Sequence, residues 1–174
     1  VLSVGGILCA RTVNEAITAS LATLRDKGVQ LLWQTGRYGA DRFQGIAKDY
    51  DNVQATTFIT RMDLAYKAAD LVVSRAGAGT ISELQILGKP VILIPSPNVS
   101  EDHQRHNAEA LSTRGAAVMI LDKDAVGQLS GSIVSLIDNP EAREDLSAKI
   151  SRMAMRDADD KIVDLIVKAV GNDR

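Results

Sequence analysis

The sequence has a single cysteine and few aromatic residues. One cysteine, Cys9, can form neither a disulfide framework nor a cysteine metal cluster within one chain, so a reducing compartment is the simpler expectation. Phenylalanine, tryptophan and tyrosine together make up only 3% of the residues. This scarcity leaves no platform on which the bases of a single-stranded nucleic acid could stack.

Long apolar runs and an excess of charge of one sign are also missing. No run approaches the roughly 18–20 apolar residues that span a bilayer, and we see no charged-then-apolar secretory leader. The formal net charge is −2, with acidic and basic residues interspersed, so no basic field would attract nucleic acid. We therefore expect a soluble protein with no nucleic-acid partner.

What is present fits one globular domain. The chain has 174 residues, of which 45% are hydrophobic and 24% charged, a composition typical of soluble globular proteins. It begins at Val1, without a methionine and inside an apolar run that reads as a strand. We therefore expect that the numbered chain starts partway through a longer protein.

Short apolar runs alternate with segments of helical periodicity along the whole chain. Asn139, Pro140 and Glu141 are a strong start signal for one helix, with a capping side chain, a proline at the first position and an acid in the first turn. We predict strands at 1–4, 29–33, 53–58, 70–74, 91–94 and 117–121, and helices near 13–24, 38–48, 61–68, from 80, and at 100–114, 122–136, 140–154 and 159–171. This alternation predicts an α/β fold, a doubly wound parallel sheet of Rossmann type that binds ligands beyond the carboxyl ends of its strands.

Glycines follow the first predicted strand. Gly5 and Gly6 stand at the turn into the first helix, where free backbone N–H groups could hold a phosphate and Arg11 would add positive charge. A purely structural glycine turn is equally compatible with this pattern. A complete G-x-G-x-x-G and a G-x-x-x-x-G-K-[ST] are both absent, which argues against a standard dinucleotide site and a P-loop.

A second glycine-rich turn, Ser74-Arg75-Ala76-Gly77-Ala78-Gly79-Thr80, is more informative. Glycines directly before a helix let a ligand approach the backbone closely, so phosphate binding is natural there. The structural alternative is a capping box, because Thr80 and Glu83 have the Thr-x-x-Glu spacing in which each side chain satisfies a backbone donor at a helix start.

The polar segment 95–107 follows the most apolar strand and could contact sugar hydroxyls. Its structural alternative is a solvated helix start capped by Ser100. His103 and His106 lack further ligands at convincing spacing, so we expect no metal there. The acids of Asp157-Ala158-Asp159-Asp160 suit the dipole of the last helix, and we interpret them as a helix start rather than a metal site.

Five groups of motifs occur together along the chain: Gly5-Gly6 with Ala10-Arg11-Thr12-Val13-Asn14, Gln34-Thr35-Gly36, Phe58-Ile59 with Met62, Ser74 to Glu83, and His103-Gln104 with Asn107-Ala108. Together they resemble the C-terminal half of the MurG family of UDP-N-acetylglucosamine transferases. The likeness covers almost the whole chain and is most specific from Ser74 to Ala108. The resemblance favours a ligand site at Thr80 and Glu83, although one residue can both cap a helix and bind a ligand.

The resemblance implies one half of a GT-B glycosyltransferase. Residues 1–174 would be the C-terminal UDP-sugar-binding domain, and the N-terminal acceptor domain would lie outside this chain. The family moves N-acetylglucosamine from UDP-N-acetylglucosamine to the 4-hydroxyl of lipid I, with inversion and without a metal or other cofactor, and so forms lipid II for peptidoglycan. The full-length protein would be cytoplasmic and peripheral on the inner membrane of a bacterium. The catalytic base and the surface for the lipid-linked acceptor would belong to the other half.

The same resemblance implies roles for individual residues. Glu83 would hold the ribose hydroxyls, and Ile59 would offer backbone groups to uracil. His103 and Gln104 would face the hydroxyls of the sugar. The diphosphate would meet a separate group of residues: Arg11, Thr35, Ala78, Gly79 and Thr80.

The first glycine loop departs from the family pattern. The family usually has Gly-Gly-Ser-x-Gly-Ala, whereas Ile7 and Cys9 replace the serine and the second glycine here. Gly79 is smaller than the apolar residue often found before the threonine, and His103 stands where some members have glutamine. The alternatives are therefore another GT-B transferase or epimerase that uses a UDP-sugar, or a non-catalytic nucleotide-binding module.

Overall fold

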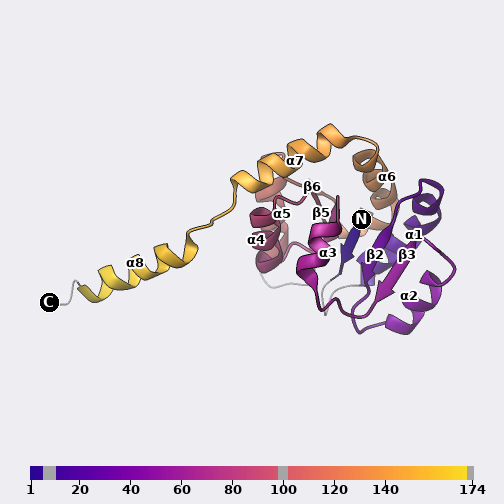
Figure 1. Cartoon of the computed structure of the whole chain (residues 1–174), viewed down its shortest axis with the longest axis horizontal. Helices are drawn as coiled ribbons and strands as arrows, with labels where there is room; N and C mark the ends of the chain where they lie inside the picture. The colour runs from indigo at the N-terminus through magenta and orange to yellow at the C-terminus, as the bar shows by residue number, and fades with distance from the viewer. Residues whose placement is uncertain (6–10, 98–101, 172–174) are drawn as a thin grey trace.

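A six-stranded parallel sheet forms the centre of the protein in the computed structural model, which describes residues 1–5, 11–97 and 102–171 (Figure 1). The strand order is β3-β2-β1-β4-β5-β6, and all five neighbouring pairs are parallel. The strands are β1 (Leu2–Val4), β2 (Leu31–Gln34), β3 (Val53–Thr56), β4 (Val72–Ser74), β5 (Val91–Leu93) and β6 (Val118–Met119). This order confirms the predicted doubly wound, Rossmann-like sheet.

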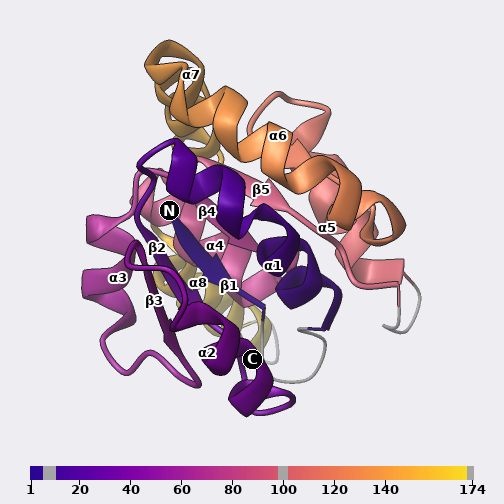
Figure 2. The same ribbon diagram turned by 90° about the vertical axis from the view of Figure 1, so that its right-hand side faces the viewer.

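Helices cover both faces of the sheet because successive strand residues point to opposite sides. Ile92 and Leu93, which are neighbours in β5, lie in different hydrophobic clusters. One cluster receives α1 (Arg11–Asp26), α2 (Ala40–Ala47) and α6 (Ala125–Ile137), and the other receives α3 (Met62–Ala68), α4 (Ala78–Leu87) and α5 (His103–Ser112). In Figure 2, α1 and α6 lie side by side over the first of these faces.

The helix starts show where local signals succeeded. Helix α7 (Pro140–Arg152) begins as predicted, because the Asn139 side chain accepts a hydrogen bond of 3.0 Å from the backbone N–H of Ala142. The single helix predicted at 122–136 is instead a short 3-10 helix, η2 (Asp122–Asp124), followed by α6. Both parts are continuous in the chain, so hydrophobic periodicity alone does not separate them.

The capping box proposed for Thr80 and Glu83 is wrong. Helix α4 begins at Ala78, and its N-cap is Gly77 in an extended conformation, so Thr80 is already the third helical residue. Glu83 lies one turn further on and cannot return to the N-cap. The expected cap Ser100 lies outside the described residues, and α5 starts at His103 behind Asp102, which has a left-handed φ of 54°.

Helix α8 (Ala158–Gly171) confirms the helix predicted at 159–171, and it projects away from the sheet and its covering helices (Figure 1). Five of its apolar side chains are 57–66% exposed: Ile162, Val163, Leu165, Ile166 and Val167. Within the described part of the chain, no helix combines the length and the apolar character needed to cross a membrane.

Candidate functional site

The carboxyl ends of the strands bring most of the predicted site residues to one edge of the sheet. The strand order reverses between β1 and β4, which are neighbours in the sheet. Helix α1 leaves β1 toward one face and α4 leaves β4 toward the other, so the starts of both helices flank this switch point. Ligands of open parallel sheets bind in such a crevice.

The first turn of α4 carries backbone N–H groups that have no partner within the helix. The first intrahelical bond runs from the Ile81 N–H to the Gly77 carbonyl at 3.0 Å, so the N–H groups of Ala78, Gly79 and Thr80 have no acceptor within the helix. Ala78 and Gly79 are exposed, and a Cβ added at Gly77 or Gly79 would meet open space. Free N–H groups and the positive end of the helix dipole favour an anion here.

Glu83 lies one helical turn beyond these amides and is held by a neighbouring helix. The hydroxyl of Tyr66, from α3, donates to Oε2 of Glu83 at 3.1 Å. Burial of the phenol, reinforced by the negative charge of Glu83, raises the pKa of Tyr66 well above its usual value of 10.0. Tyr66 therefore stays protonated and remains a hydrogen-bond donor.

The ends of β2 and β3 contribute Thr35 and Ile59, but with part of their hydrogen-bonding capacity already used. The Ile59 N–H donates to Oε1 of Gln34 at 2.9 Å. Thr35 is fully buried, and its hydroxyl lies 3.2 Å from the Thr56 carbonyl and 3.3 Å from the Gly36 carbonyl. In this conformation the Thr35 hydroxyl bonds within its own loop, and Gln34 accepts from the Ile59 N–H.

A buried charge cluster behind α4 was not found by sequence reasoning. Arg75 is 8% exposed and forms an ion pair with Asp122 of η2. The same guanidinium donates to the Ile94 carbonyl at 3.1 Å, and Thr12 of α1 donates to the other carboxylate oxygen of Asp122 at 3.0 Å. These hydrogen bonds and this ion pair connect the segments that follow β1, β4, β5 and β6. Arg75 and Asp122 are 47 residues apart, and no local pattern links them.

The loop after β5 is fastened to the start of α5. The backbone N–H of Ser96 donates to Oε1 of Gln104 at 3.0 Å, and the Asn107 amide donates to the Ala76 carbonyl at 3.1 Å. His103 is exposed at the first position of α5.

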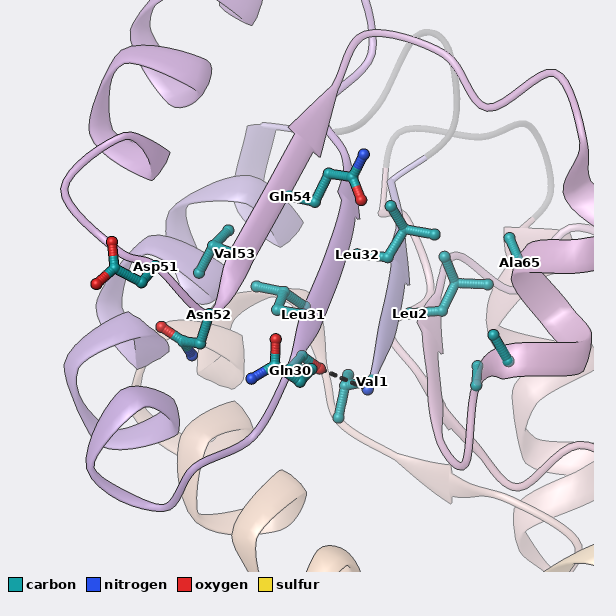
Figure 3. Close-up of a pocket in the computed structure, with 12 residues that line it drawn as sticks. Val1, Leu2, Gln30, Leu31, Leu32, Asp51, Asn52, Val53, Gln54 and Ala65 are labelled. Atoms are coloured by element: carbon teal, nitrogen blue, oxygen red, sulfur yellow. Dashed lines mark hydrogen bonds between the residues drawn. The ribbon is translucent and has the colours of Figure 1, made fainter.

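A cavity of about 400 Å³ at the opposite, amino end of β1 to β3 contains none of the predicted site residues (Figure 3). Another, of about 550 Å³, lies at the carboxyl edge beside Pro95, Ser96 and Asp122.

The remaining candidates make only local contacts or lack metal-site geometry. Arg11 is the first residue of α1, and its exposed side chain lies 3.4 Å from Glu15. Gly6, Ile7 and Cys9 lie outside the described residues. Asp157 pairs with Lys161 at 3.1 Å, which holds the pKa of Asp157 below its usual value. Among residues 1–5, 11–97 and 102–171, no three or more histidine, cysteine or acidic side chains gather as metal ligands.

Comparison with known proteins places this arrangement in a family. A transferase from Parabacteroides distasonis, UDP-N-acetylglucosamine--N-acetylmuramyl-(pentapeptide) pyrophosphoryl-undecaprenol N-acetylglucosamine transferase, is 50% identical over 172 residues, covering 98% of this chain and 47% of the relative. The Porphyromonas gingivalis protein of the same name is 48% identical, covering 100% of this chain and 46% of its own. The chain thus spans about half the length of these curated relatives.

A solved structure agrees with the sequence matches. The crystal structure of Acinetobacter baumannii MurG superposes with a TM-score of 0.83 at 30% identity, covering 96% of this chain and 49% of that one. The resemblance to the MurG family is therefore confirmed. The family model that describes the C-terminal domain of glycosyltransferase family 28 matches residues 1–162. The chain is a member of the glycosyltransferase family 28 C-terminal domain family.

Proposed function

We propose that this chain is the donor-binding half of an inverting GT-B transferase that moves N-acetylglucosamine from UDP-N-acetylglucosamine to the 4-hydroxyl of lipid I. The observation that supports this most is the start of α4, where three free N–H groups precede Glu83 by one turn. One turn of helix rises about 5–6 Å. A nucleoside diphosphate spans a comparable distance between its phosphates and its ribose hydroxyls.

Each part of the donor has a matching group on the protein. The amides of Ala78, Gly79 and Thr80 would hold the diphosphate, and the Glu83 carboxylate would accept hydrogen bonds from the ribose. The Ile59 carbonyl would accept the N3–H of uracil, a donor that cytosine lacks. Thr35 would support the loop between the base and phosphate sites through its internal hydrogen bonds, because its hydroxyl is buried.

The sugar would lie toward the start of α5. His103 is exposed there, and Gln104 keeps its amide nitrogen for a ligand while its Oε1 holds the Ser96 N–H. Arg11, exposed at the start of α1, would add positive charge near the phosphates. As the acceptor hydroxyl attacks the anomeric carbon, UDP leaves with growing negative charge, which preorganised N–H groups stabilise without a metal ion.

The rest of the reaction belongs to a second half. We propose that residues 1–174 form the C-terminal domain of a longer enzyme whose N-terminal domain supplies the catalytic base and binds the lipid-linked acceptor. Such an enzyme would act on the cytoplasmic face of the bacterial inner membrane. This half alone would bind the donor without completing transfer, and it has no nucleic-acid partner in this scheme.

Isothermal titration calorimetry with a panel of nucleotides tests the proposal. UDP and UDP-N-acetylglucosamine should bind, whereas ADP should not and CDP should bind more weakly because its N3 cannot donate to Ile59. Affinity will be modest because the closing half of the cleft is absent and part of the ligand stays hydrated. Equal affinities for ADP and UDP would contradict the proposal. No nucleotide binding at all would favour a non-catalytic module whose nucleotide site is vestigial, and a preference for another UDP-sugar would favour a different transferase or an epimerase.

A further inference from the structure

We propose that Tyr66 is a positioning residue for ribose recognition: its hydroxyl fixes the Glu83 carboxylate in the orientation that accepts the hydroxyls of the ribose. This inference rests on the proposed function, since it assumes that Glu83 binds the ribose. It assigns a role to α3, a helix that contributes no other group to the donor site.

The two side chains differ in how firmly the protein holds them. Tyr66 is only 3% exposed and packs in the same apolar cluster as Ala65, Ile81 and Leu84, so its ring has little freedom. Glu83 is exposed on α4 and would otherwise sample many rotamers. The hydrogen bond of 3.1 Å from Tyr66 therefore restricts the rotamers of the Glu83 carboxylate at the surface.

The direction of this hydrogen bond leaves the carboxylate able to bind more donors. An ionised carboxylate is an acceptor with about four lone-pair sites, and Tyr66 occupies one of them on Oε2. The remaining sites can accept two ribose hydroxyls. Because burial and the charge of Glu83 raise the pKa of Tyr66, the phenol keeps its proton and continues to donate to Glu83.

A carboxylate that is already oriented loses less conformational freedom when the nucleotide binds. The resulting gain in affinity comes through the contacts of Glu83 with the 2′- and 3′-hydroxyls and not through the phosphates or the base. Tyr66 should therefore affect discrimination between ribose and deoxyribose. A hydroxyl that merely links α3 to α4 would affect stability and leave this discrimination unchanged.

The test measures UDP and 2′-deoxy-UDP binding by calorimetry for the unmodified chain, Tyr66→Phe, Glu83→Gln and the double variant. Tyr66→Phe keeps the buried ring and removes only the hydroxyl. We expect it to weaken UDP binding about three- to tenfold, in line with the cost of immobilising one freely rotating side chain on binding, and to lower the preference for UDP over 2′-deoxy-UDP. In the Glu83→Gln background, Tyr66→Phe should change UDP affinity by less than about twofold, because the partner it orients is already altered.

Tyr50→Phe is the matched control, since it removes a phenol hydroxyl on the other face of the sheet, where Tyr50 packs beside Arg25. It should leave both affinities unchanged. If the unmodified chain binds no UDP, the proposed function fails and this inference fails with it. If UDP binds with a clear preference over 2′-deoxy-UDP and Tyr66→Phe preserves that preference, only the role of Tyr66 is wrong.

A second measurement keeps the inference testable should Tyr66→Phe fold poorly. The chain has three tyrosines, so carbon-13 labelling of the tyrosine ring carbon that bears the hydroxyl gives three resonances, assigned with Tyr38→Phe and Tyr50→Phe. Saturation with UDP should shift the Tyr66 resonance more than 2′-deoxy-UDP does. Equal shifts with both nucleotides would refute a link between Tyr66 and the ribose.

Discussion

Arg75 and Asp122 form a buried ion pair that joins the segment after β4 to the segment after β6. Their side chains are 9% and 18% exposed, and Arg75 also donates to the carbonyls of Ile94 and Pro95. Removing one partner of a largely buried pair typically costs about 3–5 kcal/mol. We therefore predict that Asp122→Ala lowers the free energy of unfolding by about that amount, as measured by urea denaturation.

Asp138→Ala provides the comparison for this prediction. Lys27 and Asp138 also form an ion pair, at 2.6 Å, but both side chains are about half exposed, at 45% and 53%. Exposed pairs contribute about 0–1 kcal/mol. Similar losses of stability for Asp122→Ala and Asp138→Ala would show that burial of the Arg75 pair contributes nothing.

Asn14 links α1 to the end of β2 through both ends of its side-chain amide. It accepts a hydrogen bond of 2.9 Å from the Trp33 indole and donates one of 2.8 Å to the Thr35 carbonyl. Asn14, Trp33 and Thr35 are all fully buried, so Asn14→Ala would leave a donor and an acceptor unsatisfied. At about 1–3 kcal/mol for each such group, we predict a loss of about 2–6 kcal/mol in the free energy of unfolding.

Asn139→Ala is the control, because it also removes an asparagine side chain, but an exposed one. Asn139 caps α7 through one exposed hydrogen bond to the Ala142 N–H. Loss of a helix cap costs about 1 kcal/mol. Urea denaturation should therefore give a much lower free energy of unfolding for Asn14→Ala than for Asn139→Ala. Equal losses of stability would contradict the bridging role of Asn14.

Sequence patterns predicted the parts of this fold that depend on local periodicity. The alternation of β-branched runs and helical segments gave the order of strands and helices, and Asn139 with Pro140 gave the start of α7. Pattern reasoning misplaced the start of α4, because a Thr-x-x-Glu spacing resembles a capping box whether or not the helix begins there. The actual start at Ala78 depends on the backbone of Gly77, which carries no side-chain signal.

Long-range contacts explain what the sequence could not predict at the candidate site. Tyr66 and Glu83 are 17 residues apart on different helices, and Gln34 and Ile59 are 25 residues apart on different segments. Neither pair has a fixed spacing that a motif could encode. Their positions follow from the tertiary fold, in which the parallel strands β2, β3 and β4 bring their carboxyl ends to one edge.

Donor binding should not depend on a divalent metal ion. The acids of Asp157 and Asp160 lie at the start of α8, and Asp157 is paired with Lys161. No metal-ligand cluster occurs in the parts of the chain that the structure describes, and Ca²⁺ or Mg²⁺ would need several oxygen ligands. We predict that the UDP dissociation constant measured with EDTA equals that measured with magnesium. A strict magnesium requirement would overturn the metal-free scheme.

The Tyr66 phenol should make stability depend on alkaline pH. The pKa of Tyr66 is raised in the folded state. Below about pH 10, the ordinary pKa of tyrosine in the unfolded state, the phenol is protonated in both states. The folded state then keeps the full stabilisation that the protonated phenol provides. Above that pH the unfolded state releases the proton first, and stability falls as pH rises toward the folded-state pKa. We predict that unfolding free energies of the unmodified chain decline more steeply above about pH 10 than those of Tyr66→Phe. Parallel declines would contradict the shift.

Glu83→Gln should weaken UDP binding far more than folding. Glu83 forms no capping box, and glutamine keeps an oxygen that can accept from Tyr66, so we expect a stability loss of about 0.5 kcal/mol or less. The ribose would lose hydrogen bonds to a charged group, each worth about 1.5–3 kcal/mol, and 1.4 kcal/mol is a factor of ten in affinity. Calorimetry should therefore show at least about a tenfold weaker UDP complex, whereas Glu144→Gln, an exposed change on α7, should have no effect on binding. A lowered melting temperature with an unchanged UDP dissociation constant would make Glu83 a purely structural partner of Tyr66, because the variant would then weaken a contact between α3 and α4 without affecting ribose binding.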